Sequence, residues 1–242
     1  MKKSVAIIQS NYIPWKGYFD LIRSVDEFIL LDEVQFTRRD WRNRNIIKTA
    51  AGPKWLTIPV QVKGKYFQKI SETEVSRIDW HKDHWNTIDH HLRRAPFFDL
   101  YEARLREAYM EAGELRFLSH INRKFIQLVS SWLGISTKLV DSREYAIATG
   151  KTERLVALCR QAGASEYVSG PAALGYLDEQ LFASSGIRVR WFEYTGYREY
   201  PQLYGPFEHR VSVLDLIMHT GPDALHFLAR IEPAGARSKW WD

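Results

Sequence analysis

The chain has 242 residues, with 34 lysines and arginines against 29 aspartates and glutamates, which gives a net charge of +5. Hydrophobic residues make up 45% and charged residues 26%, which is ordinary for a globular chain and argues against a disordered or fibrous protein. The lone Cys159 excludes an internal disulfide framework and a cysteine-based zinc site. The positive charge favours phosphate-bearing partners without choosing among nucleotides, sugar nucleotides, nucleic acid and anionic membrane.

The sequence also bears on location. It contains no run of about 18 apolar residues, so we expect no membrane-spanning helix. The opening Met-Lys-Lys leads into only five residues before Gln9, which is too short for a signal sequence. We therefore expect a cytoplasmic protein.

The first fifty residues predict a strand, a helix and a second strand. A β-branched apolar run predicts a buried strand at 4–9, and the turn-forming residues 10–14 end it. Helical spacing of apolar residues follows at 15–24, and another apolar run follows at 28–31. Because crossovers between parallel strands are right-handed, this unit predicts two parallel neighbouring strands.

The rest of the chain continues the alternation of strands and helices. Strands are predicted at 55–62, 136–140, 167–169 and 187–194, and helices at about 80–94, 98–112, 116–133, 151–162, 176–184, 211–219 and 222–230. This order predicts an α/β fold with a Rossmann-like, mostly parallel sheet flanked by helices. We expect a single domain over residues 1–242 with a helical insertion at about 79–134.

The junction of the first strand and first helix is the strongest candidate for a ligand site. In open parallel sheets, ligands bind at the carboxyl ends of the strands. Here Gln9, Tyr12 and Trp15 precede Lys16, which would add a cation at a helix start suited to phosphate, and Gly17 would allow close backbone approach. The alternative is a capped helix whose glycine packs on the sheet.

This junction also resembles the strand-loop-helix of nucleotidyltransferases and class I synthetases. Their loop ends in His-x-Gly-His, whereas Lys16 and Tyr18 stand at the two histidine positions here. Because those histidines contact the phosphates, the departure argues against adenylyl transfer.

Two further segments of the N-terminal half carry candidate binding residues. Asp32 directly follows the second strand and suits a ribose, an amine or a metal, although it could equally be a capping or loop carboxylate. In residues 39–44, cationic side chains alternate with an aromatic and an amide side chain, a pattern that suits a phosphate with an attached ring. The alternative is a solvated surface. The predicted binding residues of this stretch are Gln35, Arg39, Trp41, Arg42 and Arg44.

Weaker candidates lie in two more loops. A lysine-rich loop around Gly64 suits a second phosphate contact or, alternatively, an exposed hairpin tip; its residues are Lys63, Lys65, Gln68 and Lys69. A strand that ends in small residues offers close approach to a ligand, although Gly-Pro is also a turn signal; the residues there are Ser169, Gly170, Tyr176 and Asp178.

Three histidines, His81, His84 and His91, share one predicted helical face. Because no carboxylate or cysteine stands at ligand spacing, we predict no metal site there. The sequence has no Walker A loop and no G-x-S-x-G nucleophile motif.

Several long strings resemble the WbqC-like protein family over nearly the whole chain. They are Ile8-Gln-Ser-Asn-Tyr-Ile-Pro-Trp-Lys-Gly-Tyr-Phe-Asp20, Arg39-Asp-Trp-Arg-Asn-Arg44 and Ser169-Gly-Pro, with further matches as far as Pro206-Phe-Glu-His209. The resemblance implies a role in bacterial surface-polysaccharide (O-antigen) gene sets, in modifying amino sugars by aminoacyl transfer such as glycylation. It supplies no catalytic residues.

Our leading hypothesis is an enzyme that modifies a nucleotide-linked amino sugar by aminoacyl or acyl transfer. Such a reaction needs a base for the amine proton and positive donors for the oxyanion. Asp32 or Asp20 would be the base, Lys16 and the arginines would bind phosphate or stabilise charge, and the aromatic residues named above would stack on a ring.

Two alternatives come from other classes of protein. One is an ATP- and Mg²⁺-dependent enzyme that adenylates a carboxylate. The other is an RNA-binding protein, with a charged tRNA as aminoacyl donor. The cofactor is left open between ATP with Mg²⁺ and an aminoacyl donor.

Overall fold

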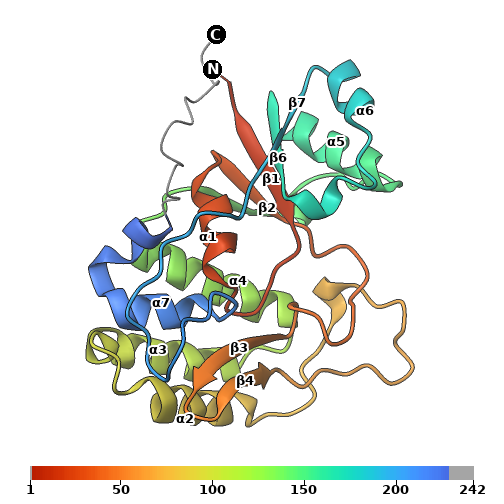
Figure 1. The fold of residues 1–242 in the computed structure, drawn as a ribbon. Coiled ribbons are helices and arrows are strands. Elements are labelled where there is room, and N and C mark those ends of the chain that lie inside the picture. Colours follow the sequence, from red (N-terminus) through yellow and green to blue (C-terminus); the bar gives the residue numbers. More distant parts are fainter. Residues whose placement is uncertain (1, 229–242) are drawn as a thin grey trace, which may run out of the picture.

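The structure, a computed structural model, describes residues 2–228 and is built around a five-stranded parallel sheet. The strands are β1 (Ser4–Ile8), β2 (Glu27–Leu30), β5 (Lys138–Asp141), β6 (Glu166–Ser169) and β7 (Arg188–Trp191). Their order in the sheet is β5-β2-β1-β6-β7, and each neighbouring pair is parallel (Figure 1). The predicted Rossmann-like α/β class is therefore confirmed.

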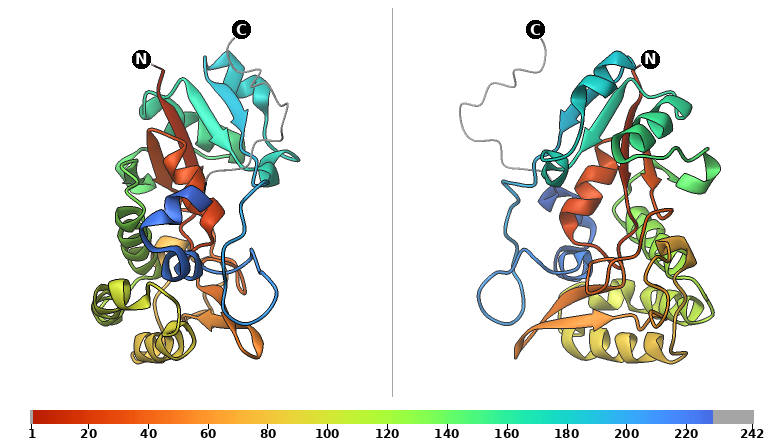
Figure 2. Two further views of the ribbon diagram at one scale, coloured as in Figure 1. Left: turned by 60° about the vertical axis from the view of Figure 1, so that its left-hand side comes forward. Right: turned by 90° about the vertical axis from the view of Figure 1, so that its right-hand side faces the viewer.

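Strand β1 lies at the centre of the sheet. Its residue Ala6 pairs with Phe28 on one side and with Val168 on the other. Helices cover both faces (Figure 2), so residues of either orientation are buried in the central strands β1 and β2, and this explains why those strands are mostly apolar. The edge strand β7 is more exposed and carries Arg188 and Arg190.

Different helices cover the two faces of the sheet. Helices α1 (Lys16–Arg23), α4 (Leu118–Trp132) and α7 (Val213–Thr220) contribute to the larger buried cluster. Helices α5 (Lys151–Gln161) and α6 (Glu179–Ser184) contribute to the smaller cluster on the other face. The winding reverses at β1 and β6, because the chain moves outward from β1 through β2 to β5 and then returns to β6. The crevice where the order reverses is the usual ligand position in such sheets.

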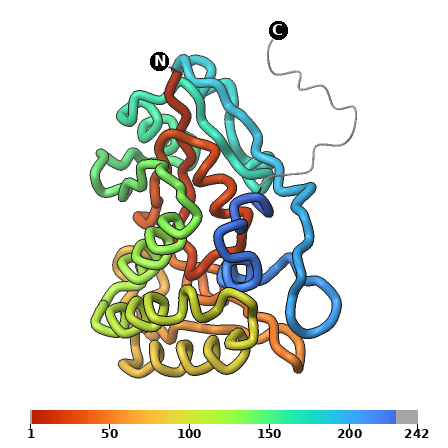
Figure 3. The backbone as a smooth tube through the Cα atoms, turned by 90° about the vertical axis from the view of Figure 1, so that its left-hand side faces the viewer, coloured from red at the N-terminus to blue at the C-terminus, as the bar shows by residue number. Residues whose placement is uncertain are grey.

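A hairpin and two helices lie beyond the carboxyl edge of the sheet. The hairpin consists of β3 (Arg44–Thr49) and β4 (Gly52–Thr57), and the helices are α2 (Trp80–Leu92) and α3 (Phe98–Gly113). Figure 3 shows the two helices side by side at the end of the molecule away from α5 and α6. The buried cluster is continuous from the sheet into this region, through side chains such as Phe19, Tyr12 and Trp80.

Some predicted boundaries differ from the structure. The strand predicted at 55–62 ends at Thr57. Strand β3 lies in the basic stretch, for which the sequence predicts no strand. In place of the last helix predicted at 222–230, the chain forms a 3₁₀-helix at Gly221–Phe227, and residues 229–230 lie outside the described residues. Within residues 2–228, no helix has the length and apolar character needed to cross a membrane.

Candidate functional site

The loop after β1 and the first residues after β2 meet at the carboxyl edge of the sheet. Asp32, only 4% exposed, accepts a hydrogen bond of 2.8 Å from the backbone N–H of Ser10. Burial raises the pKa of the Asp32 carboxyl to about 6; the nearby Asp141 adds to the rise, whereas the Ser10 hydrogen bonds and Arg42 oppose it. A carboxyl with this pKa is charged at neutral pH yet basic enough to accept a proton.

Arg42 reaches across to the loop after β1. Its guanidinium donates to Asn11 Oδ1 and, at 3.3 Å, to Gln9 Oε1, and it lies 3.8 Å from the Asp40 carboxylate. The Arg42 side chain is only 16% exposed. A guanidinium held by two neutral acceptors keeps its positive charge for a phosphate or a developing oxyanion.

Asn122 on α4 connects the loop after β1 to Arg42, and no sequence motif predicts this role. Its Nδ2 donates to Ser10 Oγ at 3.0 Å and to the Arg42 carbonyl at 2.9 Å. Its Oδ1 is buried without a partner among the described residues. Asn122 therefore fixes the position of Ser10, which donates to Asp32, relative to Arg42.

An aromatic pocket of about 510 Å³ opens beside Asn11. Its walls include Trp15, Trp41, Tyr194 and Tyr197, and polar groups from Asn45, His209 and Arg210 join them. The Trp15 and Tyr194 rings lie 5.5 Å apart between centroids. Such a pocket suits a flat or cyclic ligand, since aromatic walls and a few polar groups are the usual features of small-molecule sites.

Tyr194 closes over the end of β6 because residue 170 is glycine. A Cβ at Gly170 would lie 3.2 Å from the Tyr194 ring, which is tighter than ordinary contact. Ser169 is buried, and its carbonyl accepts the Phe192 N–H at 2.8 Å. Because β1 and β6 are neighbouring parallel strands, Ser169 and Gly170 lie at the same edge of the sheet as the loop with Gln9 and Asn11, at the reversal point of the strand order. We refer to this edge, with Asp32, Arg42 and the adjoining aromatic pocket, as the switch-point site.

The predicted residue Lys16 is buried, with only 3% of its surface exposed, and its ammonium donates to the Arg198 carbonyl at 3.1 Å. The ammonium also lies 5.2 to 5.4 Å from the centres of three aromatic rings, those of Tyr197, Tyr200 and Phe207. Burial lowers the pKa of Lys16 to about 8, although Asp215 and Glu199 oppose this. A phosphate could reach this ammonium only if the loop around it moved.

Gly17, Asp20 and Tyr12 also have structural contacts. A Cβ at Gly17 would lie 2.3 Å from the Trp15 ring, so Trp15 occupies the space predicted for a phosphate. Asp20 accepts hydrogen bonds from Arg23 and from the Tyr197 hydroxyl. Tyr12 is fully buried, and its hydroxyl bonds with His84 Nδ1 at 2.8 Å and with the Tyr109 hydroxyl at 2.7 Å.

The exposed part of the basic stretch forms a stack beside the pocket. The Arg44 guanidinium lies 4.0 Å from the Trp55 ring centre, and the Trp55 and Trp41 rings are 5.3 Å apart. Arg39 is exposed and has a positive φ of 57°. Trp41 belongs to both the stack and the pocket wall, so the stack supports one side of the pocket.

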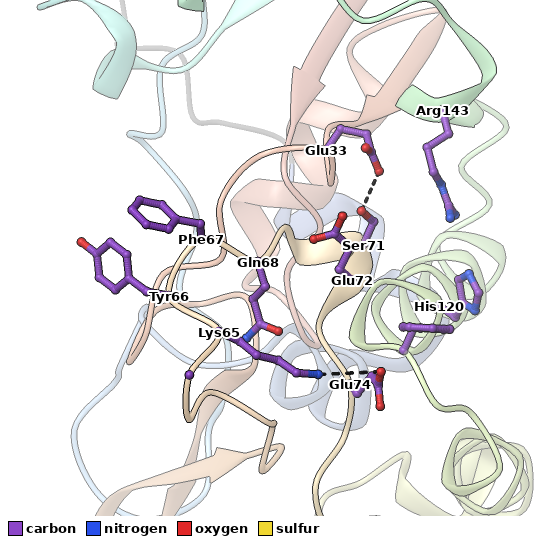
Figure 4. Close-up of a pocket in the computed structure, with 12 residues that line it drawn as sticks. Glu33, Lys65, Tyr66, Phe67, Gln68, Ser71, Glu72, Glu74, His120 and Arg143 are labelled. Atoms are coloured by element: carbon purple, nitrogen blue, oxygen red, sulfur yellow. Dashed lines mark hydrogen bonds and ion pairs between the residues drawn. The ribbon is translucent and has the colours of Figure 1, made fainter.

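The lysine-rich loop lies at a second cavity, shown in Figure 4, next to the carboxyl ends of β2 and β5. Lys69 pairs with Glu33 at 2.7 Å, Lys65 lies 3.8 Å from Glu74, and Lys63 is exposed. Gln35 Nε2 donates to the Tyr66 carbonyl at 2.9 Å.

The last two candidates lie near α6. Asp178 caps that helix by accepting from the N–H groups of Gln180 and Leu181, and Tyr176 is 55% exposed with the Lys151 ammonium 5.7 Å from its ring centre. Among residues 2–228, no group of three or more histidine, cysteine or acidic side chains is arranged to hold a metal ion. Burial lowers the pKa of His84 to about 4, which keeps it neutral.

A five-stranded parallel sheet flanked by helices, with an aromatic pocket beside the loop after β1, places the chain in the class of Rossmann-like α/β proteins. The model of the WbqC-like protein family matches residues 9–227, and the chain belongs to that family. It is 52% identical to the Mycobacterium tuberculosis protein named "Uncharacterized protein Rv1507c". The alignment spans 226 residues, which are 93% of this chain and 97% of that protein. No solved structure matches.

Proposed function

We propose that the protein transfers an aminoacyl or other acyl group to the amine of a nucleotide-linked amino sugar in bacterial surface-polysaccharide synthesis. The observation that carries the proposal is the position of a buried carboxyl of raised pKa, Asp32, near a guanidinium, Arg42, at the carboxyl edge of the sheet where both contact the loop after β1. The sugar ring would occupy the aromatic pocket, where Trp15 and Tyr194 offer flat surfaces.

The proposed reaction uses Asp32 and Arg42 in different roles. The sugar amine attacks the acyl carbonyl carbon, so a C–N bond forms and the bond from carbon to the leaving group breaks. Asp32 takes the proton that the amine loses and returns it to the leaving group. Arg42 either holds the nucleotide phosphate or stabilises the oxyanion, because its guanidinium lies against the loop after β1, where it contacts Asn11 and Gln9.

The test is product formation from defined substrates. The purified protein is incubated with a dTDP- or UDP-linked amino sugar and an activated amino acid, and the sugar nucleotide is analysed by mass spectrometry. We expect a mass increase equal to one aminoacyl residue with the wild-type protein. Asp32→Asn should slow product formation by about 10²- to 10⁴-fold, the range for losing a general base. Equal rates in the two proteins would contradict the role of Asp32.

A further inference from the structure

The second cavity, of about 930 Å³, is lined by Glu33, which directly follows Asp32, and shares no lining residue with the aromatic pocket. Its floor is the segment 64–74, which is tied to the residues after β2 by backbone hydrogen bonds. Ser71 N–H donates to the Asp32 carbonyl at 2.9 Å, and Phe36 N–H donates to the Gln68 carbonyl at 2.9 Å. The segment that lines this cavity is therefore bonded to the backbone of the proposed base, Asp32.

The charges that line this cavity favour a cationic ligand group over an anion. Three carboxylates, those of Glu33, Glu72 and Glu74, line it against two cations, those of Lys65 and Arg143. Both cations are already paired: Lys65 lies 3.8 Å from Glu74, and Arg143 donates from Nε and Nη2 to Asp141 at 3.0 and 2.7 Å. Two of the carboxylates are paired as well, Glu74 with Arg116 at 2.9 Å and Glu33 with Lys69 at 2.7 Å. The Glu72 carboxylate accepts the Lys69 backbone N–H at 3.0 Å and forms no ion pair within residues 2–228, so an ammonium would be attracted by its charge.

Gln68 supplies an acceptor that lacks a donor. Its side chain is 8% exposed, and its Nε2 donates to the Gln61 carbonyl at 2.7 Å, which fixes the orientation of the amide. Its Oε1 is consequently buried without a hydrogen-bond partner in the described part of the chain. Figure 4 shows this amide turned toward the side of the cavity where Glu74 lies. A buried acceptor is normally hydrogen-bonded, and a ligand N–H would satisfy this one.

We propose that the second cavity binds the acyl donor, and that the donor is an amino acid whose free ammonium contacts Gln68 Oε1 and the neighbouring carboxylates. This inference rests on the proposed function, in which an acyl group must reach the amine bound at the switch-point site. Tyr66 and Phe67, which are 72% and 82% exposed, form the outer rim, where they can contact the group that carries the amino acid.

Glycinamide and acetamide are matched probes, because they differ only in the ammonium group. We would record ¹H–¹⁵N spectra of the full-length protein with each. Glycinamide should shift the Gln68 side-chain amide and the backbone signals of residues 64–74, and acetamide should not.

Glu74→Gln should weaken glycinamide binding about three- to tenfold, since it removes one carboxylate charge without changing the shape of the side chain. The matched control is Glu111→Gln on α3. Glu111 is likewise a surface carboxylate paired with one lysine and one arginine, but it lies away from the cavity. Gln68→Leu, checked for folding by its thermal unfolding, should abolish the shifts.

Three results would overturn the inference: no shift with glycinamide, equal shifts with acetamide, or unchanged glycinamide affinity in both Glu74→Gln and Gln68→Leu. Binding of the sugar nucleotide is measured on the same samples to separate the two proposals. If the sugar nucleotide binds and glycinamide does not, the amino-acid site is wrong while the proposed function survives with another acyl donor. If glycinamide binds as expected and the sugar nucleotide does not, the site stands and the proposed acceptor is wrong.

Discussion

Asp32, which follows strand β2, accepts a 2.8 Å hydrogen bond from the backbone N–H of Ser10 in the loop after the neighbouring strand β1. This bond fixes the position of the buried carboxyl. Burial raises the pKa of Asp32 to about 6, because the Ser10 hydrogen bonds and the charge of Arg42 offset the cost of burying the charged form only in part. The hydrogen bond therefore positions Asp32, and burial makes it basic.

Asp32→Asn should stabilise the folded protein at neutral pH while it removes activity. The pKa of Asp32 is about 6 in the folded protein and about 3.9 in the unfolded chain. The protonated carboxyl therefore adds to the free energy of unfolding below about pH 4, and this contribution is lost as the pH rises through 6. Asparagine keeps an acceptor for Ser10 and carries no charge. Urea unfolding should show a gain of about 2 to 3 kcal/mol at pH 8 and none at pH 4. Asp223→Asn, at an exposed position, should give no gain at either pH.

The rate of acyl transfer should depend on the charged form of Asp32. As a general base, Asp32 must be deprotonated, so kcat should rise with pH through about 6 and level off above it. The measurement is a pH profile of kcat at saturating substrates. A profile that falls with rising pH across this range would instead indicate that a protonated group is required.

Gly170→Ala should weaken sugar-nucleotide binding, because the added methyl group would lie 3.2 Å from the Tyr194 ring and displace it from the pocket wall. We expect a loss of about threefold to tenfold in affinity, of the order of 1 kcal/mol. Gly175→Ala is the control in the same loop, since nothing lies within 4 Å of its added Cβ. Equal affinities for the two variants would show that Tyr194 does not contact the ligand.

Trp41→Ala should reduce affinity with little effect on stability. Its side chain is 43% exposed, yet it forms part of the aromatic pocket, so its loss removes stacking surface without opening the core. Calorimetry should show affinity falling by about tenfold, and thermal unfolding should change little. Leu100→Ala, at an exposed position on α3, should change neither quantity.

The central strands could be predicted from the sequence because they are short, mostly apolar runs between turns and helices, as is usual for parallel strands covered on both faces. Strand β3 is not predicted because Arg44, Asn45 and Lys48 interrupt its apolar residues. Lys48 is nevertheless buried, since its ammonium donates to Gln202 Oε1 at 2.8 Å, a contact that only the tertiary fold provides.

The site was only partly predictable, since sequence position does not determine where a side chain points. Gln9 and Asp32 lie at one edge because they follow the neighbouring parallel strands β1 and β2, and Arg42 reaches Gln9 from the loop before β3. Lys16 and Tyr12 come from the same loop region but turn into aromatic surroundings and the core. Asn122 and Tyr194 were missed because only the tertiary fold brings α4 and the segment after β7 to this edge.

The most direct test of the switch-point site is calorimetric titration of a UDP- or dTDP-linked amino sugar into the wild-type protein, Arg42→Ala and Arg104→Ala. Arg42 donates to both Asn11 and Gln9 at this site, whereas Arg104 is an exposed arginine on α3 that pairs with Glu107. We predict that Arg42→Ala weakens binding about 10- to 100-fold, as expected for a lost charge-assisted hydrogen bond, and that Arg104→Ala binds like the wild type. Equal affinities of all three proteins, or no binding by the wild type, would contradict the account.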